Sequence, residues 1–113
     1  AFAAGELKHG PLALVDKDTL LIAIATDPEL YEKVASNIKE VKTRGAVTMV
    51  ITQGSDEKFK DCCDTSVMLP EVSPLLASMI SIIPAQLFAY YCSIQRGYNP
   101  DQPRNLAKSV TVE

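Results

Sequence analysis

The sequence predicts an α/β fold built on a parallel sheet, and three consecutive segments carry this prediction. Residues 19–25, TLLIAIA, form a nearly continuous apolar run, which is typical of a strand covered on both faces. Residues 28–44 repeat apolar side chains at helical spacing, and residues 47–52, VTMVIT, form a second strand. A strand, an amphipathic helix and a strand within about 35 residues make a βαβ unit, whose strands are parallel and joined by a right-handed crossover.

The helix between these strands has recognisable ends. Asp27 can cap its first turn, and Pro28 fits the position that follows the cap. Gly45 supplies a stop after the last periodic residue. Acidic side chains gather early in the segment and basic ones late, which is the order that the helix dipole favours.

One further strand is predicted beyond a polar loop. Residues 53–60 are polar, and the sequence TQGSD within 52–56 could suggest a phosphate cradle. It holds one glycine and no lysine of the P-loop kind, so we favour an ordinary surface loop. The short run 66–69 reads as a third strand, which Pro70 ends.

A long segment without charge follows, from 72 to 95. It is long enough to span a membrane, but its prolines, its four serines and the α/β pattern before it argue against that interpretation. We expect a helix buried between the sheet and a second surface, which belongs to another domain or another subunit. Pro84 should kink this helix or join two helices.

Composition narrows the class of protein. The 113 residues fit one domain, and because the first residue is not methionine we expect a piece of a longer chain. A net charge of −3 offers no electrostatic footprint for nucleic acid or an anionic membrane. The three cysteines lack zinc-site and redox-motif spacing, which suggests reduced thiols in the cytosol. Cys62 and Cys63 lie beside acidic residues that disfavour a thiolate, so we interpret them as passive.

His9 is the only histidine, and it lies in a segment punctuated by Gly5, Gly10 and Pro11. An imidazole is the side chain best suited to move protons near neutral pH. Glu6 precedes it by three residues and is within reach if the segment turns helically. The residues themselves leave two roles open, a catalytic one and a structural hydrogen bond.

The tail at 97–113 is the other candidate for a site. Asn99 and Gln102 each precede a proline, which favours an extended, semi-rigid strap. Lys108 has apolar residues around it in sequence, and such company can leave a neutral amine able to form a Schiff base with a carbonyl. The alternative is a surface tail whose lysine lays its stem along an apolar surface.

Two motifs point to a family. AFAAGELKHGPLALV at 1–15 and DQPRNLAKSVTVE at 101–113 resemble the end of the glutamine:fructose-6-phosphate amidotransferase family, in its second sugar isomerase (SIS) half. The spacing between the motifs fits as well, so the resemblance covers 1–113. It implies a three-layer α-β-α sandwich with a parallel sheet, present here as a partial domain that includes the tail.

The resemblance also implies an activity and a set of roles. Enzymes of this family convert fructose 6-phosphate and glutamine-derived ammonia to glucosamine 6-phosphate, without a metal or organic cofactor. Lys108 would form the imine with the ketose, the backbone of Ala107 would lie against the sugar, and His9 would serve ring opening in the neighbouring subunit's site. We expect Glu6 among the substrate-binding residues.

The same resemblance implies the surroundings of the chain. Its partners would be the rest of the synthase, namely the glutaminase domain and the first SIS subdomain, in a cytoplasmic homodimer. The fragment alone should be inactive, because the glutamate base, the phosphate cradle and the glutaminase cysteine lie outside it. The alternative function is a non-catalytic SIS-type module that binds a sugar phosphate for regulation, since a fold does not assign a function. Lys108 separates the two, because a sensor needs no imine.

Overall fold

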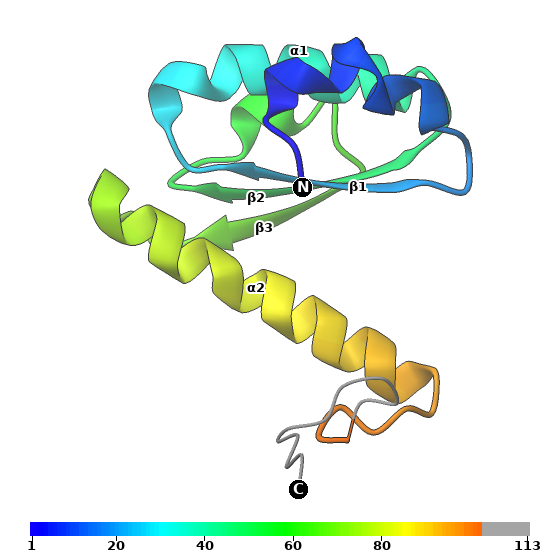
Figure 1. Ribbon diagram of the computed structural model, residues 1–113. Coiled ribbons are helices and arrows are strands. Elements are labelled where there is room, and N and C mark those ends of the chain that lie inside the picture. Colours follow the sequence, from blue (N-terminus) through cyan, green and yellow to red (C-terminus); the bar gives the residue numbers. More distant parts are fainter. Residues whose placement is uncertain (103–113) are drawn as a thin grey trace, which may run out of the picture. The chain divides into compact units, whose positions relative to one another are not determined.

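The computed structural model describes residues 1–102 of the chain, and the last eleven residues lie outside the described part (Figure 1). The chain divides into two compact units, Ala1–Ser81 and a second that begins at Ile82. The first unit holds the sheet and the elements that pack on it.

The sheet has three strands in the order β1-β2-β3 (Figure 1). They are β1 (Leu20–Ala25), β2 (Val47–Gln53) and β3 (Thr65–Leu69). Both pairs are parallel, so the predicted βαβ unit and the predicted third strand are confirmed. The register aligns Ile24 with Ile51 and Ile51 with Val67, which places the three side chains on one face of the sheet.

The crossover helix α1 (Tyr31–Lys42) covers the other face, as the apolar periodicity predicts. It follows a short 3-10 turn, η3 (Pro28–Leu30), where the Asp27 carboxylate accepts a hydrogen bond from the Glu29 amide at 3.0 Å. The predicted cap is therefore confirmed. Gly45 has a φ of +90°, which a residue with a Cβ rarely adopts, and it turns the chain into β2.

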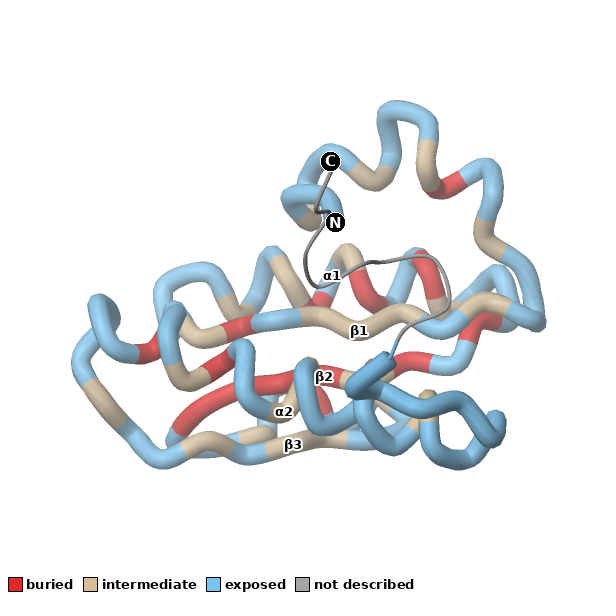
Figure 2. Tube along the Cα trace, turned by 60° about the horizontal axis from the view of Figure 1, so that its bottom comes forward, coloured by how far each residue is buried: buried red, intermediate tan, exposed pale blue. Residues whose placement is uncertain are grey.

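The core lies between α1 and the sheet. Figure 2 shows buried residues along β2 and on the inner side of α1. A further short turn, η4 (Glu57–Phe59), brings the Phe59 ring into this core, edge-on to Tyr31 with the ring centroids 5.2 Å apart. The buried members of the cluster are Ala25, Ala35, Ile38, Val50, Phe59 and Cys62.

The last helix, α2 (Pro74–Gln95), begins in the first unit. Its first turns lie on the side of the sheet opposite α1 (Figure 1), where Ala77 and Ser81 are buried. Helix, sheet and helix thus form three layers, as expected for a partial sandwich. The helix runs unbroken through Pro84, so the alternative of two joined helices is wrong. One proline removes a single backbone hydrogen-bond donor, and the other backbone hydrogen bonds of this 22-residue helix keep it continuous.

The second unit contains the end of α2 and the start of the tail. The Tyr98 amide donates to the Ser93 carbonyl and the Gly97 amide to the Ile94 carbonyl, which is the Schellman pattern with glycine at the left-handed position. The described part of the tail, 98–102, then contains a turn, in which the Asp101 amide donates to the Asn99 side chain at 2.9 Å. The predicted extended strap is therefore wrong for these residues, because the asparagine side chain stabilises a local turn instead.

Candidate functional site

His9 and Glu6 meet on one short 3-10 helix, η1 (Ala4–His9). The His9 Nδ1 and Glu6 Oε2 atoms are 3.1 Å apart. In a 3-10 helix, residues three apart lie directly above one another, which explains why this spacing brings the two side chains together. Both are exposed, at 60% and 65% of their side-chain surface, so the pair is open to a ligand or to a neighbouring surface.

The inner side of η1 is held by apolar contacts. Leu12, from the following turn η2 (Pro11–Leu14), is buried against Val41 of α1 and Ala46, and Leu7 packs on the same cluster. Gly10, with φ +153° and ψ −58°, separates the two turns directly after His9. The apolar side therefore anchors the segment, and its polar side carries His9 and Glu6.

The contact between Glu6 and His9 indicates which ring nitrogen of His9 can accept a proton. An ionised carboxylate only accepts hydrogen bonds, so Nδ1 is the nitrogen that carries hydrogen. In the neutral ring Nε2 then keeps its lone pair, and this nitrogen can take up a proton. The local geometry fits the chemistry expected of His9 and joins it to Glu6, the other predicted site residue in this segment.

The two remaining predicted residues, Ala107 and Lys108, lie outside the described residues. The structure consequently shows no distance between the tail and the His9–Glu6 pair. Their roles stay predictions. What the structure does show is that α2 ends at Gln95 and is followed by the turn at 98–102.

The carboxyl ends of the strands are tied together by one side chain that the sequence did not single out. Gln53, only 6% exposed, donates from Nε2 to the Thr26 carbonyl at 2.8 Å and accepts from the Val72 amide at 3.4 Å. The backbone carbonyl of Gln53 accepts from the Tyr31 hydroxyl at 3.0 Å. The side chain of the last residue of β2 thus links the segments after β1 and β3. No local sequence pattern predicts this role, because Thr26 and Val72 are 27 and 19 residues away from Gln53 in the sequence.

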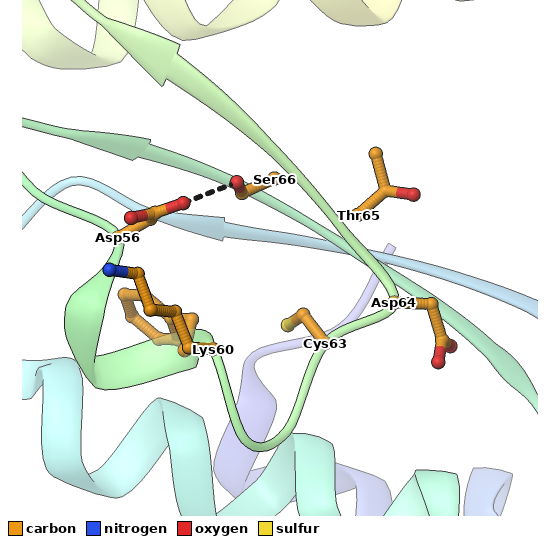
Figure 3. A pocket seen from close by; sticks show the side chains of 7 residues that line it. Asp56, Lys60, Cys63, Asp64, Thr65 and Ser66 are labelled. Atoms are coloured by element: carbon orange, nitrogen blue, oxygen red, sulfur yellow. Dashed lines mark hydrogen bonds between the residues drawn. The ribbon is translucent and has the colours of Figure 1, made fainter.

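A cavity of about 210 Å³ opens beside β3 (Figure 3). In it the Ser66 hydroxyl donates to the Asp56 carboxylate at 2.6 Å, and Cys63 lies between them and Asp64. Burial, followed by the adjacent Cys62, raises the pKa of the Cys63 thiol to about 12. The thiol therefore stays protonated at neutral pH, in agreement with the passive role predicted. Burial is the main cause, and the neighbouring acids that we invoked contribute less. The lining residues are Asp56, Phe59, Lys60, Cys63, Asp64, Thr65 and Ser66.

Asp64 forms a hydrogen-bond network at the amino-terminal ends of the strands, away from the carboxyl ends that Gln53 links. Its Oδ1 lies 2.9 Å from the Lys42 ammonium, and its Oδ2 accepts from the Thr48 amide and the Thr48 hydroxyl, each at 2.8 Å. These partners, Lys42 first, hold the pKa of the Asp64 carboxyl at about 2. The network joins the end of α1 to the starts of β2 and β3, so we interpret it as structural.

Two further features bear on the class of site. Within 1–102, no group of three or more histidine, cysteine or acidic side chains is arranged to hold a metal ion. In the same range, α2 is long and apolar enough to cross a membrane, and its most apolar stretch has a mean hydropathy of 1.6 and is 11% buried. Length and composition are weak evidence for a span, since the core helix of a globular protein passes the same test.

Comparison with known proteins identifies the class. The model of the SIS domain family matches residues 1–96, and the chain belongs to this family. The parallel sheet with helices on both sides agrees with the solved C-terminal domain of glucosamine-fructose-6-phosphate aminotransferase from Francisella tularensis. That match has a TM-score of 0.79 and 34% identity, and it covers 90% of this chain and 29% of the solved one.

Three of the similar relatives carry the same name, glutamine--fructose-6-phosphate aminotransferase [isomerizing]. The chain is 47% identical over 113 residues to the protein of Clostridium tetani, and 48% to that of Thermus thermophilus. It is 50% identical over 113 residues to that of Symbiobacterium thermophilum. Each alignment covers all of this chain and 19% of the relative. The chain therefore spans about a fifth of the length of these relatives, and the predicted family resemblance is confirmed.

Proposed function

We propose that the chain is part of the isomerase domain of an enzyme that makes glucosamine 6-phosphate from fructose 6-phosphate and glutamine-derived ammonia. The observation that carries the proposal is the identity of 45–50% along the whole chain to aminotransferases of that name. The aligned region includes both the His9 segment and the tail with Lys108. Because the chain spans a fifth of these relatives, it needs the rest of the enzyme to act.

Lys108 is the residue that forms the covalent intermediate in this proposal. Its amine nitrogen adds to the C2 carbonyl of the open ketose, and water leaves as the C=N bond forms. Only the neutral amine can attack, so the assembled site must lower the pKa of this lysine, as an apolar setting does. The backbone of Ala107 lies against the sugar in the same proposal.

His9 prepares the substrate for this step by helping to open the sugar ring. It takes the proton of the anomeric hydroxyl at Nε2 and returns a proton to the ring oxygen as the bond between C2 and that oxygen breaks. The exposed position of His9 supports a role in a site shared with another subunit. We accordingly propose a homodimer in the cytoplasm, with α2 covered by the remainder of the enzyme rather than by lipid.

The experiment that tests the proposal is borohydride trapping of the full-length enzyme with fructose 6-phosphate. Peptide mass mapping should place the sugar adduct on the peptide that contains Lys108. The Lys108→Arg enzyme should form no adduct and should lose synthase turnover by at least about 10³-fold, because a guanidinium keeps its charge and a missing nucleophile is not replaced.

Lys8→Arg is the matched control, since Lys8 is an exposed lysine beside His9. It should keep both the adduct and the turnover. An adduct on Lys8, or full synthase activity in the Lys108→Arg enzyme, would contradict the assignment. A non-catalytic sugar-phosphate module would bind fructose 6-phosphate but leave no borohydride-stable adduct on any lysine.

A further inference from the structure

We propose that Glu6 is the positioning residue of His9, and that it acts on the reaction through the imidazole rather than by binding the sugar. The inference rests on the proposed function, in which His9 moves a proton during ring opening. The observation behind it is the 3.1 Å contact between Glu6 Oε2 and His9 Nδ1.

The backbone prepares this contact. The Glu6 amide donates to the Ala3 carbonyl at 2.9 Å, which fixes the first turn of η1. The i, i+3 spacing of Glu6 and His9 then stacks their side chains on one side of the turn. Leu7 lies between them in sequence but packs on the buried cluster around Leu12, so η1 cannot rotate freely about its axis. Glu6 therefore meets a histidine whose backbone position is already set.

The carboxylate determines what His9 can do. With Nδ1–H donated to Glu6, the neutral ring has its lone pair at Nε2, on the side of the ring away from Glu6. Without Glu6, the ring can rotate and either nitrogen can carry the hydrogen. Both changes reduce the fraction of molecules in which a basic nitrogen faces the anomeric hydroxyl. A carboxylate that orients a catalytic imidazole is a recurring arrangement in enzymes that transfer protons.

A direct sugar contact by Glu6 would act differently. Its Oε2 is occupied by His9, and a glutamate that bound a sugar hydroxyl equally in ground state and transition state would change KM. A residue that only orients the proton-transfer group should change kcat and leave KM nearly constant. The same distinction appears when His9 is absent, because a positioning residue then has nothing left to position.

The experiment is a double-mutant cycle in the full-length enzyme with four proteins: wild type, His9→Ala, Glu6→Ala and the double variant. Steady-state formation of glucosamine 6-phosphate gives kcat and the KM for fructose 6-phosphate, and glutamine hydrolysis is measured separately. We expect Glu6→Ala to lower synthase kcat about tenfold, which is a part of the 10²–10⁴-fold that a general acid or base contributes. KM should stay within about twofold, and adding Glu6→Ala to His9→Ala should cost nothing more.

Two further variants sharpen the result. Glu6→Gln keeps an oxygen that accepts from Nδ1–H, so it should recover most of the lost kcat. Lys8→Ala changes an exposed residue of the same turn and should behave as wild type. Glutamine hydrolysis should be largely unchanged in all variants, which would show that the proteins are folded.

The outcomes separate this inference from the proposed function. If His9→Ala leaves synthase turnover unchanged, the role of His9 fails, and that of Glu6 fails with it. If His9→Ala slows synthesis but Glu6→Ala does not, only the inference is overturned. A Glu6→Ala effect that persists in the His9→Ala background, a raised KM, or a Glu6→Gln enzyme as slow as Glu6→Ala would each show that Glu6 does not act by orienting His9.

Discussion

A single carboxylate, Asp64, joins three elements at the amino edge of the sheet. It accepts two hydrogen bonds from Thr48 and pairs with Lys42 at the end of α1. Thr48 is fully buried, and its amide would lose its acceptor if the carboxylate were removed, whereas its hydroxyl can also donate to the Cys62 carbonyl at 3.3 Å. An unsatisfied buried donor costs far more than a lost surface ion pair, so the bonds to Thr48 matter more than the pair with Lys42.

We predict that Asp64→Asn lowers the thermal stability of the full-length protein at neutral pH. The pKa of Asp64 is depressed to about 2 in the folded state, below the usual value of about 3.9, so its contribution is present above pH 4 and is lost as the pH falls toward 2. The difference in melting temperature between wild type and variant should narrow over that range.

The control for this prediction is Asp61→Asn, an exposed acid in the same loop. It should melt as wild type does at every pH. A difference between Asp64→Asn and wild type that stays constant from pH 5 to pH 2 would show that the charge of Asp64 is not the cause.

Single residues also mark the limit of what the sequence predicts about the site. The i, i+3 spacing of Glu6 and His9 correctly indicated a contact, because it depends on local backbone geometry alone. The bonds of Asp64 to Thr48 and of Gln53 to Thr26 span 16 and 27 residues, and no local pattern encodes them. Long-range polar contacts of this kind follow from the register of the strands, which only the folded chain defines.

At the level of elements, apolar periodicity predicted the three strands and α1 to within a few residues. The signals were unambiguous there, since short apolar runs alternate with one amphipathic segment and Asp27 caps the 3-10 turn that precedes α1. The predictions were wrong at two places where a proline was given more weight than the neighbouring residues. Pro84 suggested a kink or a join between two helices, and the join is absent because α2 is one continuous helix. The prolines of the tail suggested an extended strap, whereas Asn99 forms a turn.

Gln53 shows how one side chain can couple elements, and its removal gives a further prediction. Gln53→Ala should leave the Thr26 carbonyl and the Val72 amide without their partner, at a cost of about 1–3 kcal/mol. Hydrogen–deuterium exchange of the full-length protein should become faster in the peptides that follow β1 and β3.

Peptides from the amino edge, around Asp64, should exchange as in wild type, because the Gln53 bonds are confined to the carboxyl ends of the strands. Ser55→Ala is a suitable control, since it alters the same loop and removes a hydroxyl that accepts from the nearby Glu57 amide. Equal acceleration throughout the sheet would indicate general destabilisation rather than loss of a local link.

For the whole molecule, the dominant feature is the apolar surface of α2. Most of its large side chains are exposed, including Leu75 at 80%, Met79 at 65% and Ile83 at 52%, and only Ala77 and Ser81 are buried. A contiguous apolar surface of this kind is rare on proteins that act alone. It agrees with a chain that spans a fifth of its relatives, and an exposed apolar face is what we expect of a helix that another domain or another subunit covers.

The last prediction follows from that surface: the isolated 113-residue chain should associate with itself and bind an apolar fluorescent dye. Met79→Lys or Ile83→Lys places a charge on α2 and should reduce both dye binding and the mass measured by sedimentation. Ser36→Lys adds the same charge to the exposed side of α1 and should change neither. In the full-length enzyme, where we propose that the remainder of the chain covers α2, the two α2 substitutions should instead destabilise the protein, because a charge buried without a partner is costly. A wild-type chain that sediments as a monomer at high concentration and binds no dye would show that the apolar face of α2 needs no partner.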